Sequence, residues 1–259
     1  MQPNVTSKKI NFILVSIGVA TLLFVSAYLG VASMYIYTAV LSGICAGLLI
    51  WSLELFPYKR LWLFALVLPL HLAVGGALSL FQYPNLSFYF KAIFLVGIAV
   101  LFYICLLVIN IFTVIESRGK MIPLYRAAST WAQILIVVAS ILFYSAVFKI
   151  PAHPLIQAGV VVVSAYLLLD FWSRVLKLEV EVYDASLVLV GTFWVSLFAF
   201  TMLFIPFEAL FRGLFLSSVV LFGLGFIQNY LKHTLTRRII LEHVVITVLF
   251  LLMGLLFIP

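Results

Sequence analysis

Only a few side chains in this sequence combine acid–base chemistry with a spacing that a fold could use. Glu208 and Arg212 stand four residues apart, so they would share one face of a helix. His233 and His243 follow in the chain, and histidine exchanges protons near neutral pH. An enzyme built from these residues needs its base within hydrogen-bond reach of the group that it activates. Such an enzyme therefore requires a glutamate and a histidine at the same depth in the membrane. The alternative is a Glu208–Arg212 ion pair at a helix end, which makes no such demand on the position of a histidine.

The segment from Phe207 to Leu216 resembles the first motif of the CAAX-prenyl-protease and bacteriocin-processing family of membrane proteases. That motif reads Glu-Glu-x-x-x-Arg, and in the family glutamate and histidine residues from several helices activate a water for peptide hydrolysis. Glu208 and Arg212 match the motif, but Phe207 occupies the position of the first glutamate. His243 lacks the partners of the later family motifs. The resemblance implies at most a degenerate, inactive relative.

Two further ionisable residues, His71 and Asp170, lie inside apolar runs, where such residues are functional candidates. His71 follows Pro69, and a proline frees a backbone carbonyl that the imidazole could satisfy. The alternative for His71 is a neutral ring bonded to a neighbouring helix. Asp170 could belong to a cytoplasm-facing acidic vestibule for a cation, or it could form an interfacial ion pair. The same alternatives hold for every acidic residue near a basic one at a predicted inner span end, namely Glu54 with Lys59, Glu116 with Arg118, Asp170 with Arg174 and Glu242 with Arg238.

One predicted loop mixes basic with apolar residues, a combination that suits the lipid headgroup layer. We expect Arg118, Lys120 and Arg126 either to contact anionic headgroups or to serve as plain anchors. The segment 176–184 alternates apolar and acidic residues like a strand, although an isolated strand would be marginally stable.

A run of small residues, Ala39, Gly43 and Gly47, recurs at steps of four. Small residues let membrane helices approach each other closely. This face therefore predicts helix packing, either within the chain or at the seam of a homodimer.

The composition indicates which solvent surrounds these residues. The chain is 66% hydrophobic and 9% charged, whereas a soluble domain is roughly 25% charged. No polar stretch is long enough to form a soluble domain. The net charge of +7 is explained by basic loops beside an anionic leaflet rather than by nucleic acid. Cys45 and Cys105 lie in apolar runs without metal-ligand spacing, and no cofactor motif is present.

The predicted fold is an all-α, polytopic transmembrane helix bundle forming a single domain over residues 1–259. About nine spans are expected, or eight if the short eighth segment is re-entrant. Twelve of the 15 basic residues fall in segments facing the cytoplasm if the N-terminus lies inside. This places the protein in the cell membrane with its C-terminus outside. The predicted spans are 10–30, 34–55, 61–81, 90–114, 131–148, 155–172, 185–206, 214–227 and 239–258.

Two functional classes remain open. The first is a non-enzymatic membrane component, either a permease for a small solute or ion or a partner in a membrane complex, which includes a homo-oligomer. The second is an intramembrane enzyme acting on lipid or peptide. A permease predicts polar groups that converge near mid-bilayer, drawn from His71, Asn110, Gln133, Ser140, Tyr144, Gln157 and Ser164.

Overall fold

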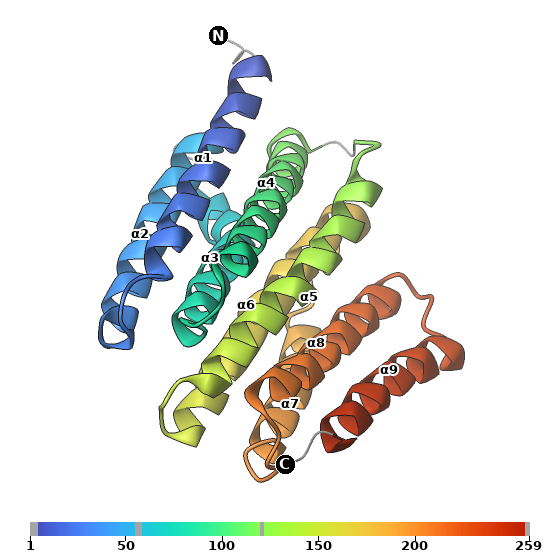
Figure 1. Cartoon of the computed structure of the whole chain (residues 1–259). Helices are drawn as coiled ribbons and strands as arrows, with labels where there is room; N and C mark the ends of the chain where they lie inside the picture. The colour runs from blue at the N-terminus through green and yellow to red at the C-terminus, as the bar shows by residue number, and fades with distance from the viewer. Residues whose placement is uncertain (1–4, 55–58, 120–121, 257–259) are drawn as a thin grey trace. The chain divides into compact units, whose positions relative to one another are not determined.

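The computed structural model describes residues 5–54, 59–119 and 122–256 (Figure 1). Every regular element in this part of the chain is helical, which confirms the predicted all-α class. The elements are α1 (Val5–Ser26), the short 3-10 helix η1 (Val31–Ser33), α2 (Met34–Ser52), α3 (Lys59–Gln82), α4 (Phe88–Arg118), α5 (Tyr125–Lys149), α6 (Pro154–Val180), α7 (Ala185–Thr201), α8 (Ala209–Leu231) and α9 (Arg237–Leu256).

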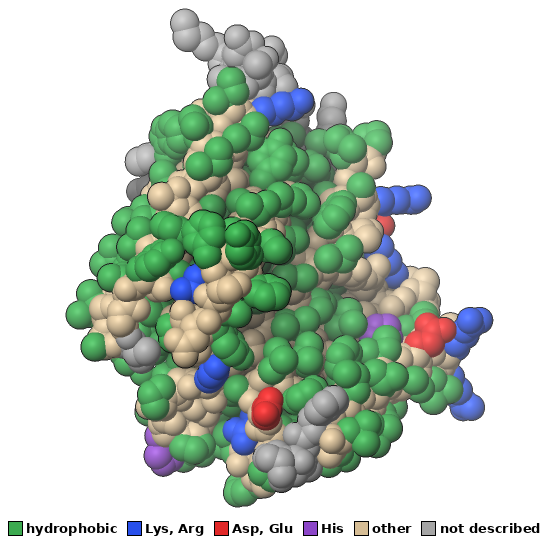
Figure 2. Space-filling model, viewed as in Figure 1, with side chains coloured by type: hydrophobic (Ala, Val, Ile, Leu, Met, Phe, Trp, Pro, Cys, Tyr) green, Lys and Arg blue, Asp and Glu red, His purple; other side chains and the backbone are tan. Residues whose placement is uncertain are grey.

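Eight of the described helices are long and apolar enough to cross a membrane. A helix satisfies its own backbone hydrogen bonds, which is the condition for exposing a chain to lipid. The face drawn in Figure 2 is mostly hydrophobic, and charged side chains on it stand singly or in small groups. The prediction of a multi-pass transmembrane bundle is therefore confirmed.

The short helix is not the one that the sequence indicated. The predicted eighth span, 214–227, is the 23-residue helix α8, whereas α7 has only 17 residues and spans about 26 Å. α8 continues past its apolar run to Leu231, and in this last part the Asn229 side-chain amide donates to the Gly225 carbonyl at 2.8 Å. The seventh span was predicted to reach residue 206, but α7 ends at Thr201.

The segment with strand-like alternation is mostly helical as well. α6 continues to Val180, and Glu181, with φ of 60°, ends it in the left-handed region. Asp184 then caps α7 by accepting from the Ser186 amide at 2.9 Å. Within the described residues a strand here would have no partner strand, so the helix satisfies the backbone better.

The chain divides into two compact units, residues 1–135 and 136–259, and the boundary falls inside α5. The prediction of a single domain stays a prediction. In the first unit α1 contacts α2, α3 and α4, and α3 also contacts α2 and α4. Leu23 of α1 is fully buried there, beside Gly76 of α3.

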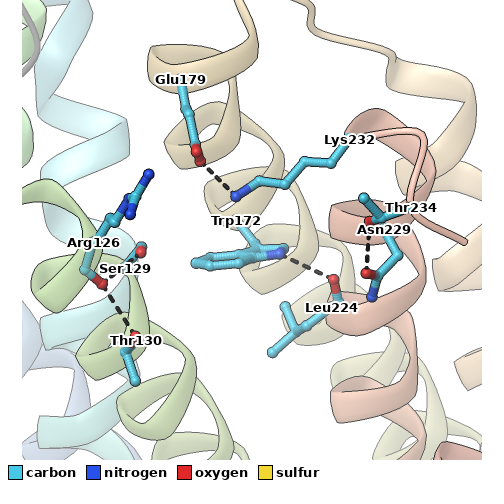
Figure 3. A network of polar contacts seen from close by, with 9 residues as sticks. All are labelled: Arg126, Ser129, Thr130, Trp172, Glu179, Leu224, Asn229, Lys232 and Thr234. Atoms are coloured by element: carbon cyan, nitrogen blue, oxygen red, sulfur yellow. Dashed lines mark hydrogen bonds and ion pairs between the residues drawn. The ribbon is translucent and has the colours of Figure 1, made fainter. Parts of the chain in front are cut away.

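In the second unit α6 contacts α7 and α8, and α8 also contacts α7 and α9. The buried Trp172 of α6 donates its indole N–H to the Leu224 carbonyl of α8 at 3.1 Å (Figure 3). Gly213 brings α8 against the backbone of α5, because a Cβ at this position would lie 2.6 Å from the Ser145 nitrogen. These contacts fix the register of α5, α6 and α8.

Candidate functional site

Glu208 and Arg212 do not form the ion pair that their spacing suggested. Glu208 is exposed as the N-cap residue of α8 and makes no side-chain capping bond. The Arg212 guanidinium donates to the Ile205 carbonyl at 3.0 Å, and its Cζ lies 5.8 Å from the centre of the Phe148 ring. Among the ion pairs of the described residues, none joins these two side chains. Arg212 therefore anchors the turn before α8.

His243 lies far from Glu208 along the antiparallel α8–α9 pair. A Cβ on Gly225 would collide with His243 Nε2, so the imidazole packs directly on α8 at residue 225. Gly225 is 17 residues beyond Glu208, about 26 Å along a helix axis. At the opposite end of the pair, Phe207 packs against Gly254. The structure thus separates Glu208 from His243. Phe207, which occupies the position of the first glutamate in the protease-family motif, packs against α9.

His71 bonds within its own helix. Its Nδ1 lies 2.7 Å from the Val67 carbonyl, which can only accept, so Nδ1 carries the proton in this contact. The carbonyl that Pro69 frees is that of Ala65, four residues earlier, and it is a different one. The imidazole therefore shares a carbonyl one turn back rather than filling the gap left by the proline.

Asp170, ten residues before the C-terminal end of α6, is held by two partners. It accepts from Arg174 Nε and from the Tyr183 hydroxyl, each at 2.7 Å, and the Arg174 guanidinium lies over the Tyr183 ring. Burial and this hydrogen bond raise the pKa of Tyr183 to about 12. Hydrogen bonds from Ser186 lower the pKa of the neighbouring Asp184. Both carboxylate oxygens of Asp170 are therefore engaged by side chains of this chain.

Other ion pairs join residues near helix ends. Arg238 pairs with Glu242 at 2.9 Å within α9, as its spacing allowed. Glu54 pairs with Lys8 of α1 at 2.8 Å, and the side chain of Lys59 lies outside the described residues. A pair that the sequence did not indicate, Glu179 with Lys232 at 2.7 Å, joins the ends of α6 and α8 (Figure 3).

Some of the polar residues considered for a solute pathway bond to nearby backbone carbonyls. Gln157 donates to the Ile150 carbonyl at 2.7 Å, and Ser140 donates to the Val137 carbonyl one turn earlier. Tyr144 of α5 and Ser164 of α6 are both buried, and their hydroxyls face each other. Neither hydroxyl has a hydrogen bond of good geometry to any described residue.

The small-residue face of α2 lies exposed. A Cβ added to Gly43 or Gly47 would meet nothing within 4 Å, so the first unit does not use this face for close packing. Its role in a homodimer stays a prediction. Of the predicted headgroup contacts, Lys120 and the Arg118 side chain lie outside the described residues. The exposed Arg126 lies in the first turn of α5, where its carbonyl accepts from Ser129 and Thr130 (Figure 3).

Sequence reasoning missed a half-open apolar groove of about 450 Å³ in the second unit, here called the α7–α9 groove. No charged residue lines it, so ionisable residues gave no signal. The spacing of aromatic residues on α8 could have indicated it. The lining comprises Val190, Gly191, Trp194 and Phe198 of α7, Phe215, Val219, Phe222, Gly223 and Phe226 of α8, and Val244, Thr247, Val248 and Leu251 of α9.

No known protein family matches the chain, and no curated protein or solved structure is similar to it beyond chance. The long apolar helices nevertheless define a class. The chain is a multi-pass integral membrane protein, and its helices are suited to contact with a lipid bilayer.

Proposed function

We propose that this chain is a non-enzymatic component of the cell membrane. The observation that supports the proposal is the separation of Glu208 from His243 by about 26 Å of α8. A general base acts within hydrogen-bond reach, about 3 Å, of the proton that it removes. Of the residues that could have formed a Glu–His centre, Glu208 instead stands exposed before the first turn of α8, and His243 packs against Gly225.

The intramembrane ionisable residues support the same proposal. His71 bonds to its own helix, and Asp170 has partners on both oxygens. Groups held in this way stabilise local structure and need no substrate to satisfy them.

A permease is a second candidate form of such a component. Its support is the facing pair of buried hydroxyls, Tyr144 and Ser164, which lack a hydrogen bond of good geometry. A buried hydroxyl without a partner costs about 1–3 kcal/mol, so a water or small polar solute would stabilise this position. Removing both hydroxyls by Tyr144→Phe and Ser164→Ala should then abolish uptake of that solute while leaving the fold intact.

We also propose that α7 crosses the membrane, so that the two ends of the chain lie on opposite sides. In this orientation the N-terminus lies in the cytoplasm and the C-terminus outside. A helix of 17 residues lies at the short end of the spanning range. The excess of basic residues in the segments that would then face the cytoplasm supports this orientation.

One experiment tests both proposals. Cysteines are placed at positions 208 and 243 in a chain in which Cys45 and Cys105 are replaced by alanine. We expect a membrane-impermeant thiol reagent to label position 208, but not position 243, on intact cells, and we expect the two cysteines not to crosslink. A chain with cysteines at positions 225 and 243 is the matched control and should crosslink. Crosslinking of 208 with 243 would overturn the non-enzymatic proposal, and protection of 208 would overturn the orientation.

A further inference from the structure

We infer that the α7–α9 groove holds one acyl chain of an anionic phospholipid, and that Arg237 binds its headgroup. The groove lies between α7 and α9, and α8, which contacts both, lies at its base. Its volume of about 450 Å³ falls within the range of small-ligand sites. Trp194 and Val248, at 44% and 45% exposed, show that the lining is accessible from outside the protein.

The length of the groove fits one leaflet. Along α8 the lining runs from Phe215 to Phe226, eleven residues or about 16 Å. Half of the hydrocarbon core is about 15 Å thick. An acyl chain that enters from the α8–α9 turn would therefore follow the groove over most of its length.

The lining disfavours a helix as the occupant. Helices in membranes pack closely on small residues, and the two glycines of the lining are already used within the chain. A Cβ on Gly191 or Gly223 would lie 3.0 or 3.2 Å from the Leu169 side chain of α6. A narrow, flexible hydrocarbon chain fits better.

Arg237 gives the groove a charged end. It lies seven, eleven and fourteen residues before Val244, Val248 and Leu251, so it shares their face of α9. It precedes Val244 by about 10 Å along the axis of α9. This distance is comparable to the thickness of a headgroup layer, about 5–8 Å, so Arg237 stands at the level of the headgroup of a lipid whose acyl chain lies in the groove. The Arg237 side chain is exposed and has no ion pair among the described residues. Its neighbour Arg238 points to another face and pairs with Glu242.

The test uses the full chain in phosphatidylcholine vesicles that contain phosphatidylglycerol. A photoreactive group is carried on the acyl chain of one lipid or the other, and labelled peptides are mapped. We expect labelling to concentrate on α7–α9 and to favour phosphatidylglycerol. Val248→Phe should fill the groove and reduce labelling by both lipids several-fold. Val245→Phe is the matched control, because this exposed valine on the same helix does not line the groove and should leave labelling unchanged.

The headgroup is tested by a second matched pair. Arg237→Gln should lower the preference for phosphatidylglycerol about fivefold, the typical effect of one basic residue near an anionic surface, and leave phosphatidylcholine labelling unchanged. Arg238→Gln should keep most of the preference. Equal losses in the two variants would overturn the headgroup site, since they would indicate only a general attraction.

A fluorescence measurement keeps the groove testable if Val248→Phe folds poorly. The fluorescence of Trp194 is obtained as the difference in emission between the native chain and Trp194→Phe. Brominated acyl chains should quench this Trp194 fluorescence. Labelling spread evenly over all helices, or no quenching of Trp194, would overturn the acyl-chain site.

Discussion

Replacing Gly213 with alanine should destabilise the second unit, because its missing Cβ makes room for another helix. The added methyl group would lie 2.6 Å from the Ser145 nitrogen and 2.8 Å from its Cα. Ordinary contacts begin near 3.4 Å, so α5 and α8 would have to separate by about 0.8 Å. The obstacle is helix backbone, which has no alternative rotamer to adopt.

The expected net cost is about 1–2 kcal/mol in the free energy of unfolding. Overpacking typically costs about 1–3 kcal/mol, and alanine returns up to about 1 kcal/mol because it favours a helix over glycine. Gly43→Ala is the control, because a Cβ there meets nothing within 4 Å. It should be neutral or stabilising by up to about 1 kcal/mol.

Unfolding can be followed in mixed micelles by titrating a denaturing detergent and recording tryptophan fluorescence. Trp172 is buried in the second unit and should report its opening. We expect a lower midpoint for Gly213→Ala and an equal or higher one for Gly43→Ala. Equal midpoints for Gly213→Ala and the native chain would refute the close α5–α8 approach.

Three further predictions concern the second unit. Gly225→Ala should lower the unfolding midpoint by displacing the imidazole of His243, and adding His243→Ala should restore most of the loss in a double-mutant cycle. Tyr183 has a pKa of about 12 in the folded chain, so the stability from its bond to Asp170 is present below about pH 10 and is lost as the pH rises to about 12; the part of the phenolate absorbance that is missing in Tyr183→Phe should therefore appear near pH 12. Trp172→Phe should cost about 1–3 kcal/mol in the detergent titration, since it removes an interhelical hydrogen bond and leaves a void; an unchanged midpoint would contradict this.

Interactions that depend on local spacing could be predicted from the sequence. Arg174 bonds to Asp170, and Arg238 bonds to Glu242, because both members of each pair lie inside one helix, where residues four apart are neighbours. Glu208 and Arg212 have the same spacing but do not pair, and Glu208 is the N-cap residue outside α8. Lys8 and Glu54 are 46 positions apart, and only the packing of α1 beside α2 brings their side chains together.

The role of small residues could not be read from their spacing. The regular series that includes Gly43 faces open space, whereas Gly213 and Gly225, which form no such series, contact other helices closely. A glycine permits close approach, but the neighbour that uses the space is chosen by the fold.

By itself the sequence determined the class of the protein, since 66% hydrophobic and 9% charged residues require lipid as the surroundings and helices as the backbone form. The tertiary structure decided which side chains meet. It separated Glu208 from His243 along α8, and it gathered ordinary apolar residues of α7, α8 and α9 into a groove. The physical reason is that burial in lipid selects helices through composition alone, whereas contacts between helices depend on register and shape.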